Sequence, residues 1–170
     1  MTACTNKTEA QSDKQHKTLV AYFSATGTTK AAAEKIAAAT GGELFAIEPQ
    51  KPYTQADLDW TDKQSRSSVE MSDASSRPAL KAKKTDIAAY DTIYIGFPIW
   101  WYTAPRIINS FIEAHNLKGK VIFPFATSGS SSIEASVNDL RKSYPTLDIR
   151  DGKLLNRATD KTVREWVGAN

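Results

Sequence analysis

A cluster of hydroxyl groups near the start of the chain has the composition of an anion-binding loop. Four of six consecutive residues carry a hydroxyl, in the segment Ser24-Ala25-Thr26-Gly27-Thr28-Thr29. An apolar run over residues 19–23 precedes it, and an alanine-rich run that ends at Gly41 follows it. Since such runs are typical of a buried strand and a helix, the loop would direct hydroxyls, amides and the positive end of a helix dipole at one point. The pattern predicts a phosphate site.

The composition of this loop excludes two common nucleotide-binding motifs. A Walker loop needs Gly-Lys-Ser/Thr before the helix, and the dinucleotide fingerprint needs three spaced glycines, whereas Gly27 is the only glycine in this turn. A simpler alternative is that the threonines only cap the helix, but four hydroxyls are more than a cap requires. The segment resembles the FMN-phosphate fingerprint of flavodoxins, in which an aromatic-ended strand leads into Ser/Thr-x-Thr-Gly-x-Thr.

Adjacent aromatic residues follow a later apolar run, over residues 92–97, in the segment Pro98-Ile99-Trp100-Trp101-Tyr102. A flat, apolar ring system such as isoalloxazine needs an aromatic wall and the exclusion of water. Adjacent side chains cannot both face one ligand, so we expect one of Trp100 and Trp101 to contact the ring and the other to pack in the core. The sequence favours neither.

A third loop, Thr127-Ser128-Gly129-Ser130, follows the apolar run over residues 120–126. The last two loops resemble the Pro-Ile-Trp-Trp-Gly-Thr-Ala-Pro and Thr-Ser-Gly-Gly loops of a bacterial subgroup of flavodoxin-like proteins. The resemblance extends from Thr18 through the last expected helix. It implies FMN as the cofactor, with the first loop around the phosphate, the aromatic loop against the ring, and the third loop offering amides to the pyrimidine edge.

The elements that must position these loops alternate along the chain. We expect strands over residues 19–23, 43–48, 92–97, 120–126 and 147–149, with a short extension at 154–155. The alternation with helical segments predicts an α/β fold: a flavodoxin-like, doubly wound, five-stranded parallel sheet of order 2-1-3-4-5 with helices on both faces. That order brings the loops after the first, third and fourth strands together at the carboxyl edge of the sheet. Pro124 predicts a bulge or an unpaired position in the fourth strand.

Side chains that can cap a helix indicate where the later helices begin. We expect the later helices to begin at Thr103, with Pro105 in the first turn, at Ser131, whose spacing to Glu134 is that of a capping box, and at Asp160. Residues 54–73 are expected to be helical in part.

Composition places the chain among ordinary globular proteins. Of its 170 residues, 41% are hydrophobic and 24% charged, and the sequence predicts a disordered lead-in over residues 1–16 and one domain over residues 17–170. The single cysteine, Cys4, excludes an internal disulfide, and two isolated histidines suggest no metal site. A net charge of +3 without a large basic cluster does not suggest nucleic acid as a partner.

No apolar run is long enough to span a membrane, and we expect a cytoplasmic protein. The segment Thr2-Ala3-Cys4 resembles the end of a bacterial lipoprotein signal, so a cell-envelope lipoprotein modified at Cys4 is the alternative if an upstream signal exists.

The resemblance implies a redox protein that passes electrons through non-covalently bound FMN to a partner protein or a small acceptor, as a monomer or weak homodimer. Two alternatives stay open: an NAD(P)H- or quinone-dependent FMN oxidoreductase, and a ligand- or partner-binding module without redox function. Three features depart from electron-carrier flavodoxins: the third loop has no second aromatic, the chain is mildly basic, and Tyr102 and Ser130 stand where glycine is frequent. They favour a more open ring face and two-electron chemistry.

Overall fold

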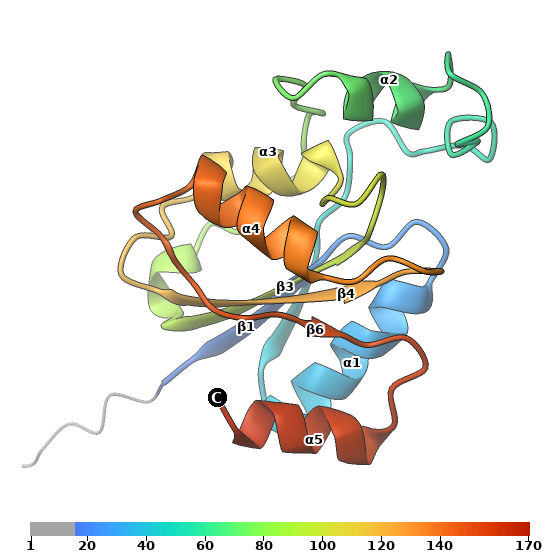
Figure 1. Cartoon of the computed structure of the whole chain (residues 1–170). Helices are drawn as coiled ribbons and strands as arrows, with labels where there is room; N and C mark the ends of the chain where they lie inside the picture. The colour runs from blue at the N-terminus through green and yellow to red at the C-terminus, as the bar shows by residue number, and fades with distance from the viewer. Residues whose placement is uncertain (1–15) are drawn as a thin grey trace, which may run out of the picture.

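A parallel sheet organises the molecule, whose structure, a computed structural model, describes residues 16–170 (Figure 1). The strand order is β2-β1-β3-β4-β5, every pairing is parallel, and β6 pairs with β4 beyond β5. The predicted order is therefore confirmed. The strands are β1 (Thr18–Tyr22), β2 (Glu43–Ala46), β3 (Thr92–Pro98), β4 (Val121–Thr127), β5 (Asp148–Ile149) and β6 (Lys153–Leu154).

Helices cover both faces of the sheet, with α3 and α4 on one face and α1 and α5 on the other, while α2 lies outside these layers (Figure 1). None of the helices within residues 16–170 is long and apolar enough to cross a membrane. The expectations for residues 1–15, including Cys4 and most of the polar lead-in, lie outside the described residues. The helices are α1 (Thr28–Thr40), α2 (Arg66–Ser72), α3 (Arg106–Ala114), α4 (Glu134–Ser143) and α5 (Asp160–Gly168), with a 3₁₀ turn η1 (Ile87–Ala89).

From Leu19 to Phe23, strand β1 and the residue after it form a continuous buried run. Leu19, Ala21 and Phe23 pack into the core under α3 and α4, whereas Val20 and Tyr22 pack into the second core against α1 and α5. Because successive side chains of a strand point to opposite faces, a strand covered on both faces must be apolar at every position. The continuous run is what a central parallel strand requires.

The fifth strand is interrupted opposite Pro124, as the sequence predicted. On one side Pro124 aligns with Ile95 in β3, but on the other β5 pairs only near Val121, and β6 resumes near Phe125. A proline has no amide hydrogen to offer a neighbouring strand, so the gap falls where a ladder bond would be missing. Gly152 fills it, since an added Cβ would lie 2.8 Å from the Pro124 carbonyl oxygen.

The predicted start of α3 was wrong. The backbone of Thr103 forms a turn with Trp100, and α3 begins only at Arg106, with Pro105 preceding it and no side-chain cap. The core face of this helix is as expected, because Ile107, Ile108, Phe111 and Ile112 are all buried.

Two other caps also differ from prediction. The amide of Ser131 donates to the Ser128 hydroxyl, which keeps Ser131 in the loop, and α4 starts at Glu134 without a side-chain cap. Thr159 rather than Asp160 caps α5, since its side chain accepts the Thr162 amide. In each case a neighbouring hydroxyl competes successfully for the amide.

The segment that follows β2 is mostly non-helical. Within residues 54–73 only α2 is helical, capped by the Ser65 side chain, which accepts the Ser68 amide. The preceding residues 54–64 form successive turns. The turns over residues 54–64 and helix α2 together form a segment, called the excursion below, that lies above the carboxyl edge of the sheet (Figure 1).

Candidate functional site

The first loop joins β1 to α1 and leaves the helix start open. Gly27 precedes α1 with φ +94°, and no side chain caps the helix or adds an acidic group to its first turn. An added Cβ at Gly27 would meet nothing within 4 Å, so the left-handed backbone, not lack of space, requires glycine. The threonines therefore do not serve as caps, and the first amides of α1 remain available to an anion.

The hydroxyls of this loop differ in exposure. Thr26, Gly27 and Thr28 are exposed and Ser24 is half-buried, with its hydroxyl accepting the Gly27 amide at 3.0 Å. Thr29 is only 1% exposed. These positions leave the hydroxyls of Thr26 and Thr28 open to solvent beside the start of α1.

A buried hydroxyl pair links the first loop to the end of β4. The Oγ1 atoms of Thr29 and Thr127 lie 2.8 Å apart. Because each hydroxyl carries one proton, one of the two donates to the other and the second keeps its proton for another acceptor. The pair thus fixes the two loops side by side and retains one donor.

The aromatic segment after β3 is a tight turn with unusual backbone angles. The amide of Trp100 donates to Thr103 and that of Thr103 to Trp100, at 3.0 and 3.1 Å. The two residues between them, Trp101 and Tyr102, have φ of +45° and +68°. This is the pattern of a type I′ turn, which normally takes glycine or asparagine. Bulky residues there store strain of about 1–3 kcal/mol.

Neighbouring elements hold this turn in place. Pro98 ends β3, and the amide of Ile99 donates to the Thr127 carbonyl at 2.9 Å. The hydroxyl of Ser136, a buried residue of α4, donates to the Tyr102 carbonyl at 3.0 Å. The strained backbone is therefore fixed from both ends.

The two tryptophans of the turn have different surroundings. Trp100 is half-buried and makes edge contacts with the rings of Phe23 and Tyr53, with both centroid separations 5.5 Å. Trp101 is 44% exposed and Tyr102 is 69% exposed. Trp100 is thus the more closely packed of the two tryptophans, and both line the pocket described below. Burial, and secondarily a hydrogen bond to Glu70, raises the pKa of Tyr53, which stays neutral beneath this wall.

Three amides of the loop after β4 have hydrogen-bond acceptors. The Ser128 amide donates to Asn156 Oδ1 at 2.7 Å, and the Ser128 hydroxyl accepts the amides of Ser130 and Ser131. Within the described part of the chain, the Gly129 amide makes no such bond. Gly129 and Ser130 are exposed, so Gly129 offers a free amide in this loop. Asn156 was not predicted, and only its position after an apolar pair could have suggested it.

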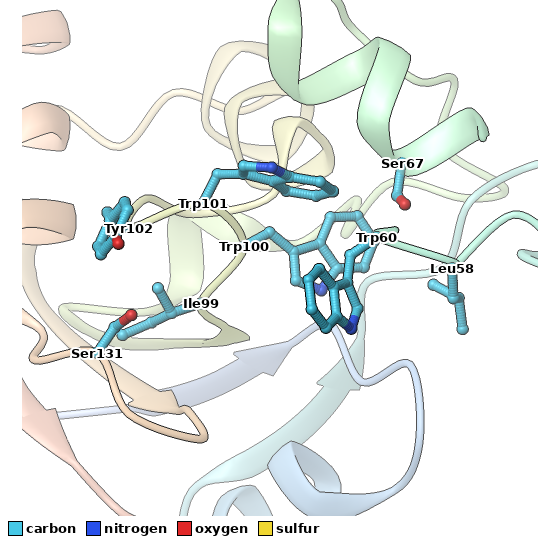
Figure 2. Close-up of a pocket in the computed structure, with 8 residues that line it drawn as sticks. All are labelled: Leu58, Trp60, Ser67, Ile99, Trp100, Trp101, Tyr102 and Ser131. Atoms are coloured by element: carbon cyan, nitrogen blue, oxygen red, sulfur yellow. The ribbon is translucent and has the colours of Figure 1, made fainter. Parts of the chain in front are cut away.

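A pocket of about 390 Å³ opens beside the aromatic turn (Figure 2). None of its lining side chains is charged. The sequence had identified three aromatic residues of the wall but neither Trp60 nor Leu58, which reach the pocket from the excursion after β2. The lining residues are Leu58, Trp60, Ser67, Ile99, Trp100, Trp101, Tyr102 and Ser131.

The predicted residues thus gather at one edge of the sheet in two chemically distinct halves. The half around Gly27 offers amides and hydroxyls, and the half around Trp101 offers an uncharged aromatic pocket. The Thr29–Thr127 and Ile99–Thr127 hydrogen bonds connect them. Such a site suits a ligand with an anionic end and a flat ring.

Comparisons with known proteins agree with this architecture. A family model described as flavodoxin matches residues 17–170. A crystal structure of a candidate flavoprotein from Bacteroides eggerthii is 60% identical, with a TM-score of 0.88, over 90% of this chain and 96% of that one. One from Bacteroides uniformis is 59% identical, with a TM-score of 0.88, over 90% and 98% of the two chains.

A more distant structure shares the fold. A flavoprotein from Lactobacillus acidophilus, solved in complex with FMN, is 24% identical with a TM-score of 0.70, over 89% of this chain and 99% of that one. The search of curated proteins finds no match. The family model spans the sheet, all three loops and the last helix, and the chain therefore belongs to the flavodoxin family.

Proposed function

We propose that this protein binds FMN non-covalently and transfers electrons through it. The observation that carries the proposal is the open start of α1, where Gly27 has φ +94° and no side chain among residues 16–170 caps the helix. A phosphate group would supply the missing acceptors on the positive side of the helix dipole. The Lactobacillus acidophilus flavoprotein, solved in complex with FMN, supports the same cofactor here.

The phosphate would be bound by neutral groups. Ser24, Thr26 and Thr28, which precede or begin α1, would supply hydroxyls, and Thr29 with Thr127 retains one further donor. Hydrogen bonds to a charged acceptor contribute about 1.5–3 kcal/mol each, so a few of them suffice for tight binding without a lysine or arginine.

The ring would lie against the aromatic turn. Ile99, Trp100, Trp101 and Tyr102 line an uncharged pocket that excludes water from a flat ring, and the free Gly129 amide can donate to its polar edge. Bound FMN supplies reversible electron and hydride transfer, and the protein sets its potential through these contacts.

The turn favours transfer of electrons in pairs. Electron-carrier flavodoxins rearrange a peptide beside the ring when one electron arrives. Here the Trp100–Thr103 bonds and the Ser136 hydroxyl fix the turn, with Tyr102 already at φ +68°. A backbone held at both ends opposes such rearrangement, so we propose a two-electron donor or acceptor as the redox partner.

The absorbance spectrum of the purified protein tests this proposal. We expect a bound yellow flavin that is released on denaturation as FMN, at one per chain. Protein without flavin that also fails to bind added FMN would contradict it. Oxidation of NADPH with a quinone acceptor, compared with reduction by a one-electron protein donor, then distinguishes a reductase from an electron carrier.

A further inference from the structure

An exposed tryptophan from a distant segment borders the pocket. Trp60 is 74% exposed, and Trp101 and Tyr102 on the same pocket are 44% and 69% exposed. Figure 2 shows Trp60 on the side of Trp100 and Trp101, with Tyr102 and Ser131 across the pocket from it. Three large apolar rings left in solvent around one pocket mark a surface that a ligand covers.

The turn that carries Trp60 is fixed on both sides. The Asp59 carboxylate accepts the amide and the hydroxyl of Thr61, at 3.0 and 2.6 Å. The Ser67 amide donates to the Asp57 carbonyl, and the Ser68 hydroxyl donates to the Asp62 carbonyl, at 2.9 and 2.7 Å. These bonds attach the residues before and after Trp60 to α2, so the ring is presented by an ordered backbone.

The excursion is in turn anchored to the aromatic wall. The Tyr53 hydroxyl donates to Glu70 at 2.5 Å, and Arg66 pairs with Glu70 at 2.8 Å while its guanidinium lies 3.9 Å from the Tyr53 ring centroid. The same Tyr53 ring contacts Trp100. The segment that carries Trp60 is therefore packed directly against the pocket.

We propose that Trp60 is a second aromatic wall of the flavin site, so that the isoalloxazine ring lies in the pocket bordered by Trp60 and by the turn of residues 100–103 (Figure 2). This inference rests on the proposed binding of FMN. The loop after β4 has no aromatic residue to cover the ring, and the uncharged lining of the pocket suits a flat apolar body. The aromatic cover comes instead from the segment after β2.

Titration of the apoprotein with FMN and with riboflavin tests this role, because riboflavin has the same ring but no phosphate. Trp60→Ala should weaken binding of both ligands by a similar factor of about tenfold, or ~1.4 kcal/mol, through the lost ring contact. Trp60→Phe should recover most of the loss. Val69→Ala is the matched control, since Val69 is 53% exposed on the same excursion but does not line the pocket.

A second readout reports the ring's surroundings directly. Iodide should quench the fluorescence of flavin bound to Trp60→Ala more strongly than that of flavin bound to the wild type or Val69→Ala. Wild-type protein that binds FMN while Trp60→Ala retains full affinity and equal iodide access would overturn the inference and leave the proposed function intact. A loss confined to FMN would also overturn it, whereas wild-type protein that binds no flavin would refute the proposed function itself.

Discussion

Two loops at the same edge of the sheet use left-handed backbone for different purposes. In the first loop a glycine, Gly27, adopts φ +94°, and the amides of the following helix stay uncapped. In the turn after β3 two bulky residues, Trp101 and Tyr102, adopt φ of +45° and +68°, and the turn closes on itself through Trp100 and Thr103.

The difference shows how one fold could divide the proposed recognition of FMN between two loops. The first loop has small, exposed residues, so its backbone and hydroxyls can approach an anion closely. The second turn makes its backbone hydrogen bonds within itself and presents aromatic side chains, which suit a flat ring. The backbone angle at Gly27 costs little, because glycine tolerates a positive φ. The turn of residues 100–103 is strained, and the Ser136 hydroxyl and the hydrogen bonds of the turn hold it in that conformation.

The largest effect should come from placing a side chain in the first loop. Gly27→Val puts a β-branched residue at φ +94° and displaces the amides of the helix start, so FMN affinity should fall about a thousandfold through loss of two or three charge-assisted hydrogen bonds. Calorimetric titration measures it. Gly119→Val is the control, because Gly119 has φ +82° and similar open space but lies outside the site. Equal losses in the two variants would show a folding effect rather than a phosphate site.

Loss of the Thr29–Thr127 hydrogen bond, which connects the two halves of the site, should weaken FMN binding less. Thr29→Val leaves the buried Thr127 hydroxyl without its partner and should lower the free energy of unfolding by about 1–2 kcal/mol. FMN binding should weaken by about 1–3 kcal/mol, because a donor to the phosphate is also lost. A double-mutant cycle with Thr127→Val measures the pair, and additive losses would show that the two hydroxyls do not interact.

Relief of strain in the second turn should change the flavin more than the fold. Tyr102→Gly should alter the free energy of unfolding by less than about 1 kcal/mol, because the relieved φ strain offsets the added chain entropy. Glycine also lets the backbone of this turn leave its present angles at lower cost, so reductive titration of the FMN-loaded protein should show more of the half-reduced flavin than the wild type, which should show little. Arg157→Gly relieves a similar angle, φ +48°, outside the turn and should leave the titration unchanged. Abundant half-reduced flavin in the wild type would contradict the proposed two-electron transfer and support a one-electron carrier.

The smallest effect tests the neutrality of the phosphate half. Lys30 is exposed in the first turn of α1, and Lys30→Ala should change FMN affinity by less than about threefold if hydroxyls and amides carry the binding. Titration at low and moderate salt gives the comparison. A much larger loss, strongest at low salt, would show that the site depends on this cation.

Local patterns made the first loop predictable. The apolar run of β1, the hydroxyls after it and the alanine-rich helix are adjacent in sequence, and each has a strong local preference. The gap opposite Pro124 was predictable for the same reason, since proline cannot donate wherever it lies. The expected core face of α3 also followed from spacing alone.

Contacts between distant segments made the second half less predictable. The packing of Trp100 depends on Tyr53, and the exposure of Trp60 depends on the hydrogen bonds that attach residues 57–62 to α2. The capping errors have a similar origin, because Ser128 competes for the Ser131 amide. Side-chain competition of this kind is decided by the folded geometry, which no local pattern encodes.

The difference in affinity between FMN and riboflavin for the wild-type apoprotein tests the central claim most directly. If the open start of α1 binds phosphate while the aromatic pocket binds the ring, FMN should bind at one per chain and at least about a hundredfold more tightly than riboflavin, the contribution of two charge-assisted hydrogen bonds. Equal affinities for the two ligands, or no binding of FMN, would contradict the assignment of the loop around Gly27 as the phosphate site.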